Sequence, residues 1–99
     1  MVVARTVKYY FKESKREEGF FEVDLAVNKK ARNANGFRGY ISLFSYDDVN
    51  VATIITFWQD TESYRNSEKV FTSDVESFMP FLEKKPEIGF HRVDSIVFP

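Results

Sequence analysis

A chain of 99 residues, of which 43% are hydrophobic and 29% charged, is long enough for one domain with one core, and we place no domain boundary within residues 1–99. Its 14 basic and 15 acidic side chains give a net charge of −1 and the basic residues are scattered along the chain, so there is no electrostatic argument for nucleic-acid binding. It contains no cysteine, so disulfides, thiolate nucleophiles and cysteine-bound metals are excluded. Eleven Phe, five Tyr and one Trp can build a large core, an interface or a pocket for a flat ligand.

The N-terminal segment carries a charge within its first five residues and lacks the long apolar stretch of a signal peptide. No apolar run approaches the roughly 20 residues that a membrane-spanning helix needs. We therefore expect a soluble cytoplasmic protein without a membrane partner.

The first predicted elements are a strand and a helix. Residues 3–11 alternate Val, Tyr and Phe with Thr, Lys and Tyr, which predicts a strand. Ser14 followed by Glu17 has the spacing of a capping box and predicts the start of a helix. Its apolar face would contain Phe20, Val23, Val27, Ala31 and Ala34. The Asn-Ala-Asn-Gly stretch at 33–36 should end this helix, with one of its last two residues at positive φ.

The middle of the chain predicts an antiparallel hairpin. Residues 37–44 and 51–58 both read as strands, and the polar turn at 45–50 between them is rich in Asp and Asn. The second of these strands is the most apolar segment of the chain, which favours a central position in the sheet.

A second helical region and a last strand complete the pattern. Asp60 is a predicted N-cap, and Ser73 with Glu76 forms a second capping-box pattern that predicts a restart of the helix. Pro80 should break or kink this helix. The segment 88–98 is predicted to be a strand.

The order β-α-β-β-α-β predicts an α+β ferredoxin-like fold, a four-stranded antiparallel sheet with both helices on one face. The hairpin carries large side chains on both faces. One parity has Phe37, Ile41, Leu43, Ile55 and Phe57, and the other has Tyr40, Phe44, Ile54 and Trp58. Because a bare apolar sheet face usually marks an interface, we expect a homodimer joined through the open sheet faces.

Most catalytic signatures are missing. The four glycines are too scattered for a phosphate-binding loop, and His91 is the only histidine, so we predict no metal site and a structural role for His91. Glu17 and Glu18 point to different sides of a helix, and Asp47 and Asp48 fall in a turn. We interpret both pairs as solvated surface and turn residues.

Trp58, the only tryptophan, leaves two interpretations open. It ends a predicted strand, Asp60 follows as the N-cap, and Tyr64 falls early in the next helix. Trp58 and Tyr64 could line a site for a flat, partly polar ligand near the helix N-terminus, where free N–H groups carry partial positive charge. Alternatively, Trp58 fills the core and Tyr64 shields it.

Two stretches, "NGFRGYISLFS" and "TFWQDTESYRNSE", resemble the antibiotic biosynthesis monooxygenase-like domains of the dimeric α/β-barrel superfamily. In that family a Pro-Gly-Phe-x-Gly entry to the second strand precedes a third strand that ends in Trp. Gly36, Phe37, Gly39 and Trp58 stand at matching places, with Asn35 in place of the proline. The resemblance covers nearly the whole chain.

The resemblance implies a homodimeric barrel with a pocket between sheet and helices in each subunit, and oxygenation of a small molecule without metal or flavin. It assigns Trp58 and Tyr64 to the catalytic pocket, with Arg65 extending the match. Ile54 stands where the quinone-forming members carry an asparagine. A haem-degrading branch uses a histidine on the second helical region, and residues 58–84 contain none.

Two functions of different class follow. The first is a cofactor-independent monooxygenase for a small planar aromatic substrate, a quinol or polyketide-like compound. Trp58 would position that substrate, Tyr64 and Arg65 would bond its oxygens, and Tyr40 and Tyr10 would contribute to the wall. The second is a non-catalytic dimeric barrel that binds a small apolar ligand.

Overall fold

The structure is a computed structural model that describes the backbone of all 99 residues and every side chain except those of Val70, Thr72 and Ser73. In chain order its elements are β1 (Val3–Tyr10), the 3₁₀ turn η1 (Glu13–Lys15), α1 (Arg16–Ala31), β2 (Phe37–Phe44), β3 (Val51–Trp58), α2 (Thr61–Phe78), the 3₁₀ turn η2 (Met79–Phe81) and β4 (Glu87–Arg92).

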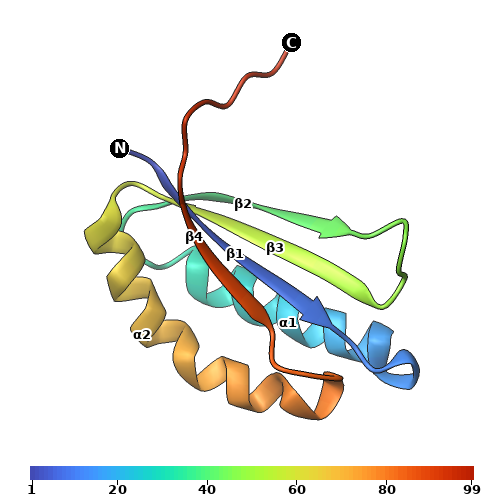
Figure 1. Cartoon of the computed structure of the whole chain (residues 1–99). Helices are drawn as coiled ribbons and strands as arrows, with labels where there is room; N and C mark the ends of the chain where they lie inside the picture. The colour runs from blue at the N-terminus through green and yellow to red at the C-terminus, as the bar shows by residue number, and fades with distance from the viewer.

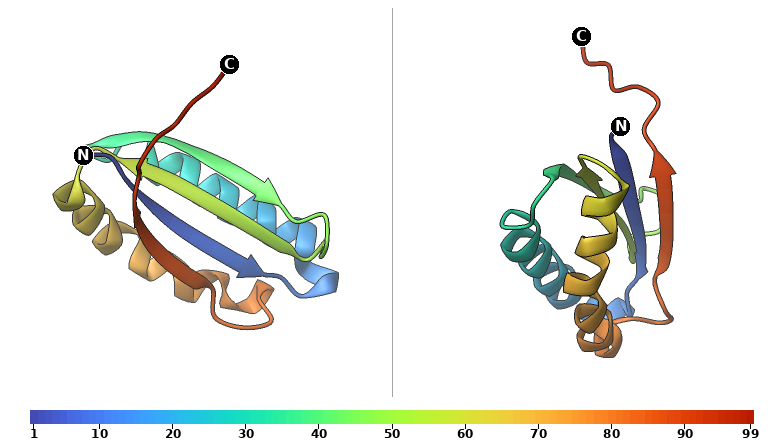
Figure 2. Two further views of the ribbon diagram at one scale, coloured as in Figure 1. Left: turned by 45° about the horizontal axis from the view of Figure 1, so that its top comes forward. Right: turned by 90° about the vertical axis from the view of Figure 1, so that its left-hand side faces the viewer.

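The four strands form one sheet in the order β2-β3-β1-β4, and every neighbouring pair is antiparallel. Both helices cover the same face of this sheet and leave the other face open (Figure 1; Figure 2, right). The predicted α+β ferredoxin-like layout is therefore confirmed, as are the β2–β3 hairpin and the inner position of β3.

The core lies between the sheet and the two helices. Alternate residues of the inner strands point into it, as the period of two predicts. The strands contribute Val3, Val7, Tyr9, Ala52, Ile54 and Trp58, and the helices contribute Val23, Val27, Ala31, Tyr64, Phe71 and Phe78.

Phe37 does not follow the predicted parity. It pairs with Trp58, whereas Gly39 pairs with Phe57, so Arg38 is an extra residue in β2 and forms a bulge. The bulge turns Phe37 toward the helices, where its ring packs edge-on against the indole of Trp58 at a centroid distance of 5.7 Å. Gly39 has a φ of 130°, a backbone conformation that a side chain rarely permits. The bulge therefore corrects the prediction that Phe37 shares a face of the sheet with Ile41 and Leu43.

The capping box predicted at the start of α1 is wrong. Ser14 lies inside η1, and α1 begins at Arg16 after Lys15, which makes no side-chain cap hydrogen bond. The chain first closes a tight turn in which the Lys15 amide donates to the Lys12 carbonyl at 2.9 Å. This turn brings the chain back from the end of β1 and takes up the residues that a capping box would have used.

The predicted stop after α1 is confirmed, although the helix ends three residues earlier than its apolar pattern suggested. Its last residue is Ala31, and the Ala34 amide donates to the Ala31 carbonyl in the turn that follows. Gly36 has a φ of 82°, as predicted for one of the two turn residues. A side chain at Gly36 would also collide with Ser63 of α2. Gly36 thus permits both the turn and its close approach to α2.

Helix α2 begins as predicted and continues further than predicted. The Asp60 carboxylate accepts from the Ser63 amide at 2.8 Å, which caps the helix. No break occurs at Ser73, whose side chain lies outside those described, because Tyr64, Phe71 and Phe78 keep one face of α2 packed on the sheet along its whole length. The predicted restart is therefore wrong, and α2 ends just before Pro80.

Strand β4 is shorter than the predicted strand at 88–98. It pairs with β1, and its last residue, Arg92, lies opposite Val3, the first residue of β1. One further hydrogen bond joins the Val93 amide to the Val2 carbonyl, and the remaining residues then extend away from the body (Figure 1). Pairing stops because the neighbouring strand has ended. Among the described residues no helix combines the length and apolar character needed to cross a membrane.

Candidate functional site

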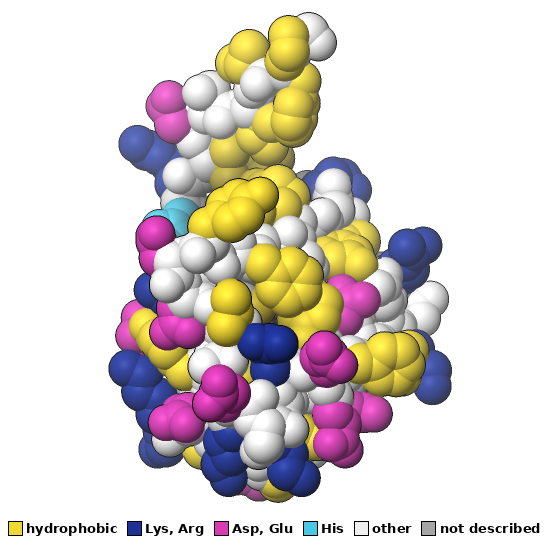
Figure 3. Space-filling model, turned by 90° about the vertical axis from the view of Figure 1, so that its right-hand side faces the viewer, with side chains coloured by type: hydrophobic (Ala, Val, Ile, Leu, Met, Phe, Trp, Pro, Cys, Tyr) yellow, Lys and Arg dark blue, Asp and Glu magenta, His cyan; other side chains and the backbone are white. Residues whose placement is uncertain are grey.

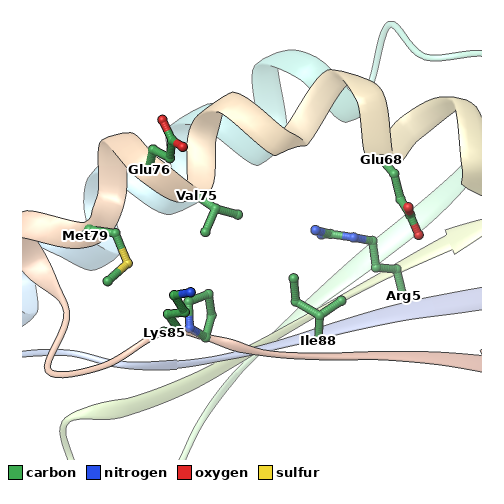
Figure 4. A pocket seen from close by; sticks show the side chains of 8 residues that line it. Arg5, Glu68, Val75, Glu76, Met79, Lys85 and Ile88 are labelled. Carbon is green, nitrogen blue, oxygen red and sulfur yellow. The ribbon is translucent and has the colours of Figure 1, made fainter.

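A pocket of about 520 Å³ opens between α2 and the β1–β4 edge of the sheet, on the helix-covered side (Figure 4). We refer to it as the α2–β4 pocket. Its apolar walls come from Val75, Met79, Pro86 and Ile88, and its charged groups are Arg5, Glu68, Glu76 and Lys85. This combination of apolar walls with a few polar groups is typical of small-molecule sites.

Arg5 is the most deeply placed of these charged groups. It lies on the core-facing side of β1, is only 8% exposed, and pairs across the sheet with Thr56 on one side and Phe90 on the other. Its Cζ lies 5.4 Å from the centre of the Phe71 ring. Its buried Nε has no hydrogen-bond partner among the described side chains. Figure 4 shows the guanidinium extending into the pocket beneath α2.

The sequence analysis missed Arg5, although the sequence carries a signal for it. The alternation that placed Val7 and Tyr9 on one face of the first strand also places Arg5 on that face, two residues earlier. A cation on the core face of a strand is uncommon and deserves a functional explanation.

Trp58 is completely buried behind this pocket. Its indole Nε1 donates to the Thr56 hydroxyl at 2.9 Å, and its ring packs edge-on against Phe71 at a centroid distance of 6.4 Å. Phe71 contacts Trp58 and also carries the guanidinium of Arg5 over its ring. Trp58 therefore supports the pocket from the core side and is not among the residues that line it.

Tyr64 is the fourth residue of α2, as its spacing predicted, and is buried beside the pocket. Its ring stacks on Phe90 at a centroid distance of 4.2 Å and an interplanar angle of 24°. Burial, followed by a hydrogen bond with Glu68 and the charge of that carboxylate, raises the pKa of Tyr64 to about 12, although Arg5 acts in the opposite direction. The phenol is therefore neutral near pH 7.

Tyr9, two positions beyond Val7 on the core face of β1, behaves similarly. Burial raises its pKa to about 12, with a smaller increase from Asp74 and a decrease from Arg5. Since Tyr9 and Tyr64 both remain protonated, neither phenol provides negative charge to Arg5.

Three of the other predicted site residues lie away from this cluster. Arg65 is exposed on α2. The Tyr40 hydroxyl accepts from the Asn28 side chain at 2.6 Å, on the α1 side of the core. The Tyr10 hydroxyl donates to Glu87 at 2.6 Å near the end of β1, outside the α2–β4 pocket.

Ile54 shares the helix-facing layer of β3 with Trp58 and is 2% exposed. It pairs with Val7 of β1 and Ser42 of β2, so it lies deeper in the core than the α2–β4 pocket. Its side chain has no group that could bond a substrate oxygen.

The residues interpreted as structural lie at the surface and in the hairpin turn. His91 is exposed on β4, and its Nε2 lies 3.2 Å from the Thr6 hydroxyl oxygen, within hydrogen-bonding distance. Glu17 and Glu18 are exposed, and the Asp48 carboxylate accepts from the Asn50 amide in the hairpin turn. Among the described side chains, no three His, Cys, Asp or Glu residues lie close enough together to bind a metal ion.

No protein-family model matches the sequence, and no curated protein sequence matches it. Solved structures do match. SnoaB from Streptomyces nogalater, a cofactor-independent oxygenase solved as a mutant, superposes with a TM-score of 0.80 at 14% identity, covering 97% of this chain and 96% of that one. The chain has the antibiotic biosynthesis monooxygenase fold. The monooxygenase ActVA-Orf6 from Streptomyces coelicolor, solved with Nanaomycin D, gives 0.79 at 16% identity, covering 98% and 91%. An antibiotic biosynthesis monooxygenase-like protein from Nitrosomonas europaea gives 0.78 at 11%, covering 91% and 88%.

At such identities the likeness shows the monooxygenase fold alone, and the chemistry has to be argued from this chain's own side chains. Within that fold the chain has a pocket between sheet and helices, where the resemblance placed one. Arg5 lies at the inner end of the pocket, and Trp58 and Tyr64 do not line it. Trp58 packs against Phe71, the ring over which the Arg5 guanidinium lies. Tyr64 stacks on Phe90.

Proposed function

We propose that the chain is a cofactor-independent monooxygenase that oxidises a small planar aromatic substrate, a quinol or polyketide-like phenol, in the α2–β4 pocket. The observation that carries this proposal is an apolar pocket of about 520 Å³ with a buried guanidinium at its inner end. That volume lies within the roughly 300–1,000 Å³ range of small-ligand sites. The fold shared with SnoaB, itself a cofactor-independent oxygenase, supports the reaction class.

The reaction needs an electron-rich substrate that reduces dioxygen itself. A phenol ring C–H and O–H become two carbonyl groups, one atom of O₂ enters the ring, and the other leaves as water with the two hydrogens. The phenolate is the form that gives up electrons to O₂ most readily. A nearby guanidinium favours the ionised form, so Arg5 would lower the pKa of a phenol bound beside it.

The proposed roles of Tyr64 and Trp58 follow from their contacts. Tyr64 lies behind the pocket and donates its hydroxyl to Glu68, which lines the pocket, so Tyr64 would act by holding that carboxylate in place. Trp58 acts as a positioning residue for Arg5. Its ring packs against Phe71, over which the guanidinium lies, and its indole N–H donates to Thr56, the cross-strand neighbour of Arg5.

Two observations favour a second candidate, a non-catalytic barrel that binds a small ligand. Trp58 is fully enclosed, and Ile54 provides no polar group in the layer where the quinone-forming proteins have an asparagine. The same pocket would then bind an aromatic compound without oxidising it.

Oxygen consumption separates the two candidates. Metal-stripped protein should consume oxygen with at least one member of a panel of naphthols, anthrones and hydroquinones, with one water and one quinone formed for each O₂. We expect Tyr64→Phe and Arg5→Met to reduce the rate, and the exposed-surface variant Lys69→Met to leave it unchanged. No uptake above the background of the substrates alone would leave the binding function.

We also propose that the chain forms a homodimer through its open sheet face. Ile41 and Leu43 of β2 are 41% and 47% exposed on that face. Three large apolar side chains of the C-terminal tail are also exposed: Ile96, Val97 and Phe98. Figure 3, which views the molecule from the end where the β2–β3 hairpin lies, shows hydrophobic side chains along this tail. An apolar surface of this kind usually marks a protein interface.

Sedimentation equilibrium tests the homodimer. A dimer at micromolar concentration that becomes monomeric in Leu43→Glu would support it, whereas a wild-type monomer at that concentration would contradict it.

A further inference from the structure

We propose that Arg5 is the recognition site for an oxyanion carried on a flat aromatic ligand, so that the α2–β4 pocket selects aryl carboxylates or phenolates over neutral compounds of the same shape. This deepens the proposed function and rests on its pocket, because it states the charge that the substrate carries where it meets the protein. It does not require the chain to turn that ligand over.

The burial of Arg5 is the first argument. A guanidinium stays charged in proteins, and removing it from water is unfavourable unless an anion compensates. Arg5 is 8% exposed, its cross-strand neighbours Thr56 and Phe90 supply no charge, and the neighbouring Glu68 carboxylate is exposed to water and hydrogen-bonded to Tyr64. An apolar residue at this core-facing position would satisfy the packing equally well. The charge is therefore better explained by a ligand than by the fold.

The orientation of the guanidinium is the second argument. The Phe71 ring lies against one of its faces, with Cζ 5.4 Å from the ring centre, which restrains its plane. Its Nε is buried without a partner among the described side chains, so the packing of the sheet leaves part of its donor capacity unused. The far end of the side chain extends into the pocket (Figure 4). A guanidinium held in this way presents terminal N–H groups to an entering oxyanion.

Glu68 is the neighbouring carboxylate and points toward Arg5 from α2 (Figure 4). It also accepts a hydrogen bond from Tyr64, which is counted among the causes of the raised pKa of that phenol. Because a guanidinium carries five N–H donors, an oxyanion can bind to Arg5 even with the Glu68 carboxylate beside it. The other pocket carboxylate, Glu76, points away from the sheet in Figure 4.

The pocket walls define the rest of the ligand. Val75, Met79 and Ile88 form apolar surfaces beside Arg5, and Lys85 provides a second cation at the far side (Figure 4). Apolar walls of this kind suit an aromatic ring, and the cation at the inner end suits an acidic group at one edge of that ring.

A pair of probes of equal shape tests the proposal. 2-Naphthoate is an anion at neutral pH, and 2-naphthamide replaces one carboxylate oxygen by an uncharged NH₂ group. Isothermal titration calorimetry with the full chain should show roughly tenfold or greater preference for 2-naphthoate, which is the gain expected when a neutral hydrogen bond becomes charge-assisted. Equal affinities for the two probes would overturn the proposal.

Variants assign the preference to Arg5. In Arg5→Met the ratio of the affinities for 2-naphthoate and 2-naphthamide should fall to about one. Arg5→Lys should retain part of the preference for 2-naphthoate, because lysine keeps the charge without the planar fork. Lys69→Met, which removes one exposed positive charge from α2 outside the pocket, should bind both probes like the wild type. An unchanged preference in Arg5→Met, with native circular dichroism, would refute the assignment. If Arg5→Met does not fold, the same comparison is made on Arg5→Lys, where an undiminished preference counts against the proposal.

The two proposals can fail separately. Arg5-dependent selection of 2-naphthoate without oxygen consumption by any quinol would confirm oxyanion recognition and reject the monooxygenase. Oxygen consumption without selection of the anion would support the monooxygenase and reject oxyanion recognition by Arg5.

Discussion

The bond between the Trp58 indole and the Thr56 hydroxyl gives the sharpest test of how the layer beneath the pocket is stabilised. Trp58 is 0% exposed and Thr56 3% exposed, so water cannot replace the 2.9 Å hydrogen bond. Thr56→Val keeps the shape of the side chain but leaves the indole N–H unpaired, which costs about 1–3 kcal/mol. The new methyl group recovers at most about 0.8 kcal/mol. We therefore expect a net loss on the order of 1 kcal/mol, within about 0.2–2.2 kcal/mol, in the free energy of unfolding.

Urea denaturation at fixed protein concentration measures this loss, and the thermal midpoint should fall by about 4–8 °C for each kcal/mol in a domain of this size. Thr53→Val is the matched control, because Thr53 lies on the same strand but is partly exposed on the opposite face of the sheet. We expect the control to change stability by less than about 0.5 kcal/mol. Equal effects of the two substitutions would refute the claim that the buried indole depends on Thr56.

Two further predictions concern the helices. Gly19→Ala should lower the free energy of unfolding by about 1 kcal/mol. The new Cβ would lie 2.8 Å from both Phe11 Cδ1 and Phe81 Cβ, and this overpacking outweighs the gain in helix propensity. A higher thermal midpoint would contradict this prediction. Hydrogen bonds from Ser63 lower the pKa of the Asp60 carboxyl. The ionised carboxylate therefore stabilises the folded state at pH values above the ordinary aspartate pKa. This stabilisation is lost as the pH falls through the lowered pKa. Asp60→Ala should accordingly lower the thermal midpoint at neutral pH and approach the wild type in acid, while Asp60→Asn keeps the cap and shows a smaller change; a pH-independent difference for Asp60→Ala would count against the carboxylate.

Local patterns predicted the fold because each strand and the second helix are marked by their own residues. Alternation defined the strands, Asp60 marked the start of α2, and the glycine at position 36 marked the turn after α1. The features that were missed depend on partners distant in the sequence. The length of β4 is set by where β1 begins, and the parity of Phe37 by a bulge against β3.

The candidate site was predicted in part. The spacing of Trp58 and Tyr64 correctly placed one at the end of a strand and the other in the first turn of a helix. It did not indicate that neither side chain would line the pocket, or that they would pack against Phe71 and Phe90, because those rings come from later segments. Arg5 was not predicted, because a charged residue near the end of a strand is ordinarily exposed and its burial depends on α2 and β4, which come much later in the sequence.

The central claim is that an aromatic oxyanion binds between α2 and β4 with its charge against Arg5. A crystal structure of the protein soaked with 2-naphthoate tests it directly. The account predicts density for the ring against Val75, Met79 and Ile88, with the carboxylate within hydrogen-bonding distance of the Arg5 terminal nitrogens. Naphthoate bound on the open sheet face or on the α1 side, with the α2–β4 pocket empty at saturating probe, would contradict it.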